Sequence, residues 1–223
     1  SHVWAHSFHC EKTREVLSKF DKIIYIIRDP RDAALSLSRY AFTPYHKKFF
    51  TAAQSTPEDF LNEKLIDMMN QWVRHVGDYL KHIQEYGFYV VFYERFLADF
   101  KHEISNLCRY LRLTLDKDEI DRIEKSVSVE NLKQHNPHHV NRGQFGQWKD
   151  QFSGQQKKAA LKMAGPLLNL LNYPEKDGDD RLPCLPQQLS VSELEKIMAS
   201  TKRHFFVGRA KRYLQKRMAS ALA

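Results

Sequence analysis

The sequence has few of the features that mark a membrane protein or a disulfide-rich protein. It has three cysteines among 223 residues, far apart and without a CxxC pair. That spacing argues against a disulfide framework and favours a reducing compartment. No apolar run approaches the roughly 20 residues of a membrane span, and no signal-peptide pattern opens the chain. These absences predict a soluble, cytoplasmic protein without a transmembrane segment.

A glycine-rich phosphate loop of the form G-x-x-x-x-G-K-[ST] is also missing, and the chain begins at Ser1 in mid-pattern. We therefore expect a fragment that lacks its natural N-terminus. The net charge is +8, and residues 190–223 carry eight Lys and Arg against two Glu, so 8 − 2 = +6 belongs to this end. The pattern predicts a domain over residues 1–174, a linker rich in Pro, Gly and Asp over 175–189, and a basic helical tail over 190–223.

Two apolar runs predict strands, and each is followed by a helical pattern. Ile23–Ile27 reads as a strand buried on both faces, and Asp29 and Pro30 open a helix to about Tyr40. Phe88–Phe92 reads as a second strand. The other predicted helices are 56–86, 100–111, 116–126 and 155–171, with a tail helix opened by a Ser192–Glu195 capping box. This alternation predicts an α/β protein with a parallel sheet flanked by helices.

A charge cluster follows the first predicted strand, in Arg-Asp-Pro-Arg-Asp. Parallel sheets bind ligands at the carboxyl ends of their strands, where the next helix offers free N–H groups. Arg28 lies at such an end, and Ser36 follows two turns into the helix. An arginine and a hydroxyl in this position suit a phosphate or sulfate ester. The alternative is that Arg28 and Asp32 form an ion pair that only fastens the turn.

A second basic segment, residues 140–152, has glycines on both sides of an aromatic residue. Gly143 and Gly146 would let the backbone approach an anion closely, with Arg142 before them and Trp148-Lys149 after them. By itself such a loop is a weak motif.

Taken in order, these segments resemble the PAPS-dependent sulfotransferases, the cytosolic-type branch and its bacterial relatives, over roughly residues 1–171. The resemblance implies a P-loop-kinase-like sulfotransferase fold, here lacking its first strand and phosphosulfate loop. It implies PAPS (3′-phosphoadenosine 5′-phosphosulfate) as co-substrate, adenosine 3′,5′-bisphosphate as product, and no metal. The residues at the family's donor-binding positions are Arg28, Ser36, Tyr93, Ser128, Asn141, Arg142 and Gly143.

The family also uses a histidine shortly before the first motif as general base, and His2 occupies that position. The implied function is transfer of a sulfuryl group to a hydroxyl or amine of a small-molecule, glycan or lipid acceptor. Without the phosphosulfate loop, this chain alone is expected to be inactive. The aromatic-rich segment Tyr40–Phe50 is a candidate for the acceptor mouth.

The chain departs from the family at several positions. Val129 replaces an aromatic that stacks on adenine, and Asn141 replaces an arginine. The family's dimer motif is not preserved, because Lys158 stands where a glutamate belongs.

Two other interpretations concern groups outside the donor motifs. A non-catalytic protein could bind anions, nucleic acid or a membrane surface through the basic C-terminal helix. We expect no nucleic-acid partner, although peripheral membrane contact by the tail stays open. The histidines give a zinc alternative, from His2, His6 and Cys10 at helical spacing with His9 beside them, or from the cluster at 135–139. No ligand pattern is complete, so no metal site is predicted.

Overall fold

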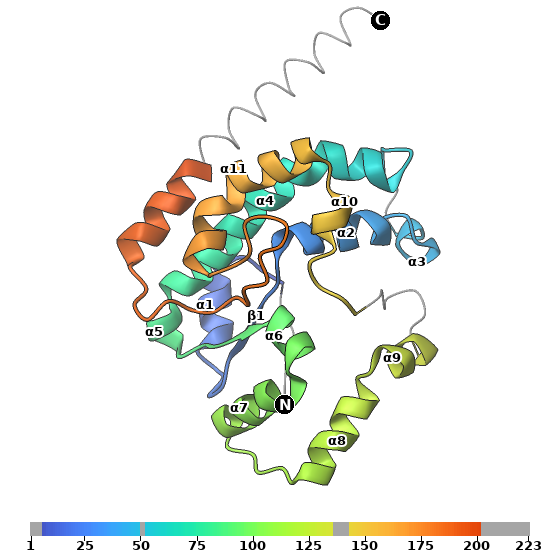
Figure 1. Cartoon of the computed structure of the whole chain (residues 1–223). Helices are drawn as coiled ribbons and strands as arrows, with labels where there is room; N and C mark the ends of the chain where they lie inside the picture. The colour runs from blue at the N-terminus through green and yellow to red at the C-terminus, as the bar shows by residue number, and fades with distance from the viewer. Residues whose placement is uncertain (1–5, 50–51, 136–142, 202–223) are drawn as a thin grey trace, which may run out of the picture.

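The sheet of the protein consists of two short parallel strands. In the computed structural model, which describes residues 6–49, 52–135 and 143–201, these are β1 (Ile24–Ile27) and β2 (Tyr89–Phe92). Ile24 lies beside Tyr89 in the ladder and Ile27 beside Phe92, so both strands end at the same edge. The α/β prediction with a parallel sheet is confirmed (Figure 1).

Helices make up most of the rest of the described chain. They are α1 (Glu11–Leu17), α2 (Pro30–Tyr40), α3 (Pro44–Lys47), α4 (Pro57–Lys81), α5 (Ile83–Tyr86), α6 (Tyr93–Ala98), α7 (Phe100–Leu111), α8 (Lys117–Ser126), α9 (Val129–His135), α10 (Trp148–Gln151) and α11 (Gly154–Leu170). Residues 191–201 are helical as well. None of the helices in the described ranges is long and apolar enough to cross a membrane.

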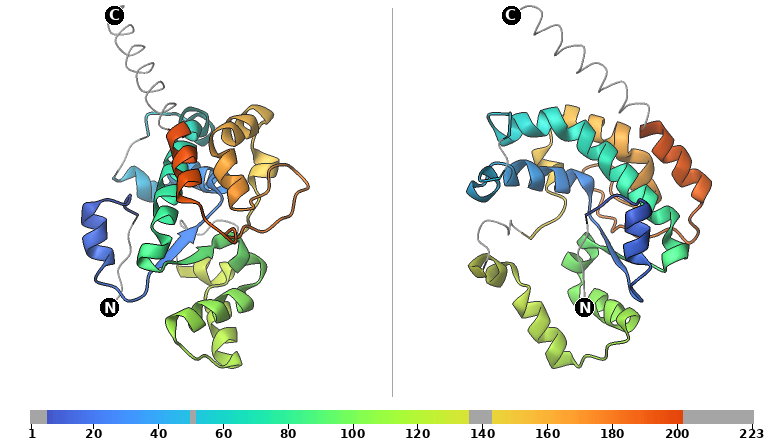
Figure 2. Two further views of the ribbon diagram at one scale, coloured as in Figure 1. Left: turned by 90° about the vertical axis from the view of Figure 1, so that its left-hand side faces the viewer. Right: turned by 180° about the vertical axis from the view of Figure 1, so that it is seen from behind.

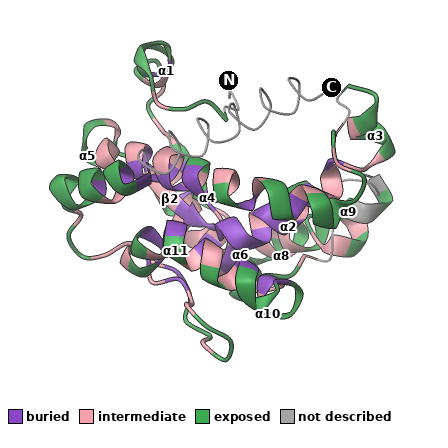
Figure 3. Ribbon diagram, turned by 90° about the horizontal axis from the view of Figure 1, so that it is seen from above, coloured by how far each residue is buried: buried purple, intermediate pink, exposed green. Residues whose placement is uncertain are grey.

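The core lies where α4 packs between α2 and α11 (Figure 1). Met69 and Val73 of α4, Leu167 and Leu168 of α11, and Ile27 of β1 are fully buried. Figure 3 shows the buried residues concentrated in the interior and the outer helices α1 and α3 largely exposed. The helices α7, α8 and α9 run away from this body as an arm, in each view of Figure 2.

One face of β1 is exposed, which corrects the prediction of a strand buried on both faces. Tyr25 and Ile27 face the core, whereas Ile24 is 39% exposed and Ile26 is 54% exposed. On the same face of β2, Tyr89 stacks on Tyr110 of α7 at 4.9 Å between ring centroids. The helices of the described chain thus cover this face over β2 and leave it open over β1.

Local capping signals were reliable for most helices. Asp29 accepts a hydrogen bond from Arg31 N–H at the start of α2, and Thr56 does so from Asp59 N–H at the start of α4. The capping box at Ser192 was wrong. Ser190 Oγ accepts from Glu193 N–H, so this helix begins two residues earlier than predicted.

The segment predicted as a linker packs against the core. Leu185 and Leu189 lie against the core cluster, and Tyr173, just before the segment, is fully buried. The helix at 191–201 continues this packing through the fully buried Leu194. A segment rich in Pro, Gly and Asp is therefore held by its few apolar side chains. The domain division stays a prediction, and the rest of the basic tail lies outside the described residues.

Candidate functional site

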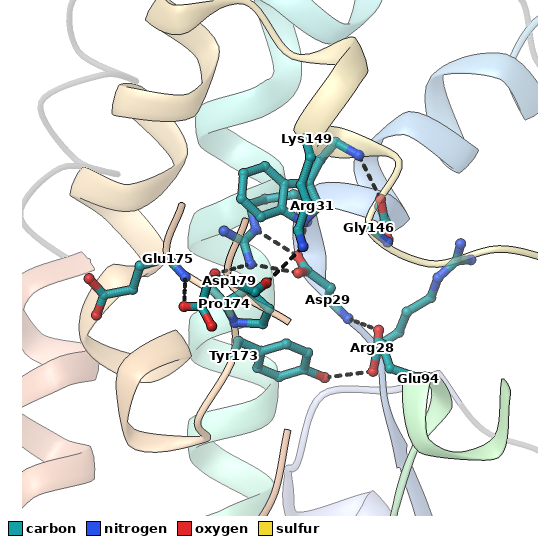
Figure 4. Close-up of polar contacts among 12 residues, drawn as sticks. Arg28, Asp29, Arg31, Glu94, Gly146, Lys149, Tyr173, Pro174, Glu175 and Asp179 are labelled. Carbon is teal, nitrogen blue, oxygen red and sulfur yellow. Dashed lines mark hydrogen bonds and ion pairs between the residues drawn. The ribbon is translucent and has the colours of Figure 1, made fainter. Parts of the chain in front are cut away.

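The carboxyl ends of β1 and β2 bring the first charge cluster beside the segment that follows β2. Arg28 and Asp29 follow β1, and Tyr93 and Glu94 follow β2. Trp72 of α4 donates its indole N–H to the Arg28 carbonyl at 2.9 Å, which anchors the end of β1 to the core. Figure 4 shows Arg28, Asp29 and Glu94 together at these strand ends.

Glu94 ties the two strand ends together. Its Oε1 accepts the Asp29 backbone N–H at 2.7 Å, and its Oε2 accepts the Tyr173 hydroxyl at 3.1 Å (Figure 4). The residue is only 3% exposed. Burial raises the pKa of Glu94 to about 7, because a buried carboxylate loses its hydration. The sequence did not predict this role, because Glu94 belongs to none of the motifs and only follows the predicted donor-binding residue Tyr93.

Replacing Glu94 with glutamine is expected to flatten the dependence of stability on pH. Folding raises the pKa of Glu94 from 4.5 to about 7, so between these pH values the folded protein holds a proton that the unfolded chain has released. The contribution of this proton to stability is fully present below pH 4.5 and is lost as the pH rises through 7. The free energy of unfolding should therefore fall by about 3 kcal/mol over this interval. Glutamine keeps an acceptor for Asp29 N–H and carries no charge. Urea titrations from pH 5 to 8 would measure the difference.

Glu58→Gln, at an exposed glutamate in the first turn of α4, is the matched control and should keep the wild-type profile. Some slope should remain in the Glu94 variant, because burial also raises the pKa of Asp32. Parallel wild-type and Glu94→Gln profiles would show that Glu94 does not take up a proton on folding.

Arg31 forms a buried ion pair with Asp29. It is fully buried, and its guanidinium donates to Asp29 at 2.9 Å from Nε and 2.6 Å from Nη2. Nη2 also donates to the Pro174 carbonyl at 2.7 Å, and the guanidinium carbon lies 3.6 Å from the Trp148 ring centroid. Arg31 is therefore a structural cation that connects α2, α10 and the 173–174 segment.

Asp32 holds the glycine-containing loop against the start of α2. Its carboxylate accepts the backbone N–H groups of Gly146 and Trp148. Burial raises the pKa of Asp32, and the neighbouring Asp29 raises it further. No hydrogen bond or salt bridge joins Asp32 to Arg28 in the described chain. The alternative of an Arg28–Asp32 ion pair is therefore wrong, and Asp32 instead joins the two predicted phosphate motifs.

Arg28 forms no salt bridge with a carboxylate within the described residues, although its charge acts on Asp32 from a distance and opposes the rise in the pKa of that carboxyl. Its guanidinium carbon lies 4.7 Å from the centre of the Tyr93 ring, a cation–π contact between two predicted donor-binding residues. Its Nε is buried without a hydrogen-bond partner. In Figure 4 the side chain points away from Pro174 and Asp179, where Arg31 is held. A half-buried cation with an unpaired donor is suited to an anionic ligand.

Gly143 lies against the start of α9. Its φ is +60°, and a Cβ added there would lie 2.1 Å from a methyl carbon of Val129. Only glycine combines this backbone conformation with such a close approach. Ser128, next to Val129, accepts the Asn131 N–H at 3.3 Å and so caps the first turn of α9. The contact places the loop beside the predicted adenine segment.

The structure brings together part of the predicted donor site. Arg28 contacts Tyr93, Asp32 binds the 146–148 loop, and Gly143 lies beside the residue that follows Ser128. Ser36 is half-buried on α2, eight residues beyond Arg28. His2, Asn141 and Arg142 lie outside the described residues. The roles of all these residues in donor binding remain predictions.

Lys149, a basic residue that follows the glycines of the loop, is paired with acidic residues in the structure. Its ammonium donates to the Asp179 carbonyl at 2.7 Å and to the Asp180 carboxylate at 3.1 Å. A cavity of about 260 Å³ lies beside it, lined also by Glu94, Tyr173 and Arg181. Arg181 is paired with Asp179 at 2.7 Å. Since both cations on this cavity have acidic partners, Arg28 is the better candidate to bind an anion.

Comparison with known proteins gives one family match. A family model described as a sulfotransferase domain matches residues 3–171. Mouse sulfotransferase 2A6 is 26% identical over 178 residues, which cover 73% of this chain and 60% of the relative. Guinea pig (Cavia porcellus) 3-beta-hydroxysteroid sulfotransferase is 30% identical over 136 residues, covering 60% of this chain and 45% of the relative.

A third relative, the amine sulfotransferase of Oryctolagus cuniculus, is 24% identical over 112 residues, covering 50% of this chain and 36% of the relative. The chain therefore spans 36% to 60% of the length of these three relatives.

Two solved structures share the fold. Mouse sulfotransferase SULT7A1 complexed with PAP has a TM-score of 0.53 at 23% identity, and the match covers 61% of this chain and 54% of that one. Retinol dehydratase in complex with androsterone and the inactive cofactor PAP has a TM-score of 0.56 at 23% identity, with 76% and 51% covered. The predicted sulfotransferase fold is confirmed.

Proposed function

Because the chain belongs to the sulfotransferase domain family, we propose that the whole protein transfers a sulfuryl group from PAPS to a hydroxyl or amine of a small-molecule acceptor. The observation that carries this proposal is Arg28. It ends β1 beside the start of α2, contacts Tyr93, and has no carboxylate partner among the described residues. A 3′-phosphate of the donor would supply that partner.

The donor would lie along the edge of the sheet where the charge cluster after β1 meets the glycine-containing loop. Arg28 and the Ser36 hydroxyl would bind the 3′-phosphate, with Asn141, Arg142 and the Gly143 backbone covering it. Tyr93 and Ser128 would contact the nucleoside. The Asp32 bonds to Gly146 and Trp148 support this arrangement, because they hold the loop near the start of α2. The PAP bound in two solved structures of the same fold is a further reason to propose PAPS.

The chemistry is an in-line displacement at sulfur. The acceptor oxygen or nitrogen attacks the sulfur, the bond from sulfur to the 5′-phosphate oxygen breaks, and adenosine 3′,5′-bisphosphate leaves. His2 would take the proton from the acceptor, which suits an imidazole near neutral pH. The cationic groups would stabilise charge on the transferring group, as in phosphoryl transfer.

Several finer points belong to the same proposal. Since the sequence has no phosphosulfate loop, this chain alone would not turn over substrate. The names of relatives include hydroxysteroid and amine sulfotransferases, which favours a small-molecule acceptor with a hydroxyl or an amine group. Tyr45 and Phe49, both exposed in the aromatic-rich segment, would contact this acceptor. Free Cys10, Cys108 and Cys184 suit the proposed cytoplasmic location.

Arg28→Ala is expected to weaken binding of adenosine 3′,5′-bisphosphate to this chain by about 1.5–3 kcal/mol, the range for a hydrogen bond to a charged group. The wild-type chain should bind this nucleotide and adenosine 3′-monophosphate, and should bind adenosine 5′-monophosphate much more weakly. The reason is that only the 3′-phosphate half of the proposed site is present. Calorimetry with the three nucleotides would measure both effects.

Lys149→Ala is the matched control, because its ammonium is held by Asp179 and Asp180 and should not contact the nucleotide. Equal affinity of wild type and Arg28→Ala would remove Arg28 from the donor site. Equal affinity for the 3′- and 5′-monophosphates would contradict the proposed placing of the 3′-phosphate.

The alternative of a non-catalytic binder finds no support in the comparisons. The family match ends at residue 171, before the basic tail. Most of the tail lies outside the described residues. The dimer motif was already absent from the sequence, so we propose no dimer by that route.

A further inference from the structure

The segment before α1 lies along one face of α4. The Ser7 carbonyl accepts the Tyr79 hydroxyl at 2.9 Å and lies 3.1 Å from Nε2 of His75. Phe8 packs edge-on against His75, with 5.2 Å between their centroids. This attachment brings His9 to the C-terminal end of α4.

His9 meets an aspartate and a second histidine there. Within the described chain, His9, Asp78 and His82 form the one group of three potential ligand residues whose ligand atoms all lie within 4.8 Å of one another. The imidazole rings of His9 and His82 have their centroids 3.9 Å apart. All three residues are half-buried. The group lies on α4 and the N-terminal segment, away from the strand ends.

The hydrogen bonds of the two imidazoles leave nitrogens available for a metal. His82 Nδ1 lies 3.3 Å from the Asp78 carbonyl. If Nδ1–H donates to this carbonyl, the lone pair is on Nε2, which is how metal-bound histidines are commonly held. Nε2 of His9 is buried and has no hydrogen-bond partner.

We propose that His9, Asp78 and His82 bind a divalent transition-metal ion of the zinc type, with solvent at the remaining position. Two imidazoles and one carboxylate suit zinc, whereas magnesium and calcium prefer oxygen ligands alone. Ligand atoms around zinc lie about 3.3 Å apart, given bonds of roughly 2.0–2.1 Å. Small rotations of the side chains would close the remaining distance.

This site differs from the zinc alternative that the sequence offered. Helical spacing grouped His2, His6 and Cys10, with His9 beside them. In the structure Cys10 lies with its Sγ 3.2 Å from the Thr13 hydroxyl. His9 is now joined to ligands 69 and 73 residues further along the chain, by the packing of its segment onto α4. The proposal revises the prediction of no metal, and it does not depend on the proposed sulfuryl transfer. A bound ion would fasten the segment leading to α1 onto α4.

The test is a zinc titration of the 223-residue chain, followed by calorimetry and by thermal unfolding. We expect one tight site, and a rise in Tm when zinc is in excess, since an ion that binds only the folded state stabilises it. His9→Ala, His82→Ala and Asp78→Asn should each weaken that site at least tenfold. His102→Ala, at an exposed histidine in the first turn of α7, is the control and should leave it unchanged.

Two further measurements separate loss of metal binding from loss of folding. Asp78→Asn preserves the size of the side chain, and circular dichroism would verify that each variant is folded. Cobalt substitution should give the intense visible absorption of tetrahedral coordination in wild type and in His102→Ala only. Zinc binding of equal affinity in wild type and the three ligand variants would overturn the proposal, as would the absence of a tight site in wild type.

Discussion

Arg31→Met is expected to lower the free energy of unfolding by about 3–5 kcal/mol, the usual cost of removing one partner of a buried ion pair. The loss has three sources. The Asp29 carboxylate, 3% exposed, would remain in the interior without its cation. The Pro174 carbonyl would lose its donor, and the guanidinium would no longer stack on Trp148. Urea unfolding at pH 7 would measure the change.

Arg28→Ala is the matched control, because Arg28 lies three residues before Arg31 and forms no ion pair within the described chain. Its effect on stability should be below about 1 kcal/mol. Since a loss of 3–5 kcal/mol is a large part of the stability of a domain, Arg31→Met could leave too little folded protein to measure. The double variant Asp29→Asn/Arg31→Met then becomes the decisive protein, because asparagine still caps α2 and carries no charge that would need Arg31 as its partner.

The double variant should be more stable than Arg31→Met alone. If the two arginine variants lost equal stability, or if the double variant were the less stable, Arg31 would not be the structural cation of the cluster. The assignment of Arg31 as the structural cation and of Arg28 as the anion-binding residue would then have to be withdrawn.

Sequence patterns predicted the local structure because its causes are local. Asp29 with Pro30 and Thr56 with Pro57 begin helices through contacts within four residues. Gly87, with a φ of +60°, ends the helical run after Tyr86 because glycine adopts that conformation without strain. The two strands were equally recognisable, as short apolar runs followed directly by helices.

The roles of the charged residues could not be read from the same patterns. Arg28 and Arg31 look equivalent in the sequence, and only the carbonyl of Pro174, 143 residues away, shows which of them is held in the interior. Asp32 finds its partners 114 and 116 residues away. Ile24 and Ile26 are as apolar as Ile27, yet no described helix covers them. These outcomes depend on tertiary contacts that leave no local signal.

The roles of Glu94 and of the 173–174 segment at the site also depend on tertiary contacts. The sequence marked Tyr93 through its family position, and the neighbouring glutamate carried no signal of its own. Pro174 and Tyr173 begin a stretch whose composition is typical of a linker. In the structure these residues close the interior side of the strand ends, through the Tyr173–Glu94 and Pro174–Arg31 hydrogen bonds. A prediction from composition depends on the many polar residues of this stretch and gives no weight to the single buried aromatic residue, Tyr173.

His2→Ala is expected to lower kcat by about 10²–10⁴-fold in a protein that carries a phosphosulfate loop, because that is the usual contribution of general-base catalysis. Donor affinity should hardly change, since the proton that His2 would accept belongs to the acceptor. Initial-rate measurements with PAPS, together with calorimetry of adenosine 3′,5′-bisphosphate, would separate the two quantities.

His6→Ala is the matched control for the same experiment. His6 is exposed, lies four residues beyond His2, and belongs neither to the proposed donor site nor to the proposed metal site. Its removal should change kcat by less than a few-fold. A His2 variant that still transferred sulfate at a near wild-type rate would contradict the assignment of the base. If His6→Ala alone lost the activity, the base would be His6, and the position of the histidine relative to Arg28 would have been misjudged by four residues.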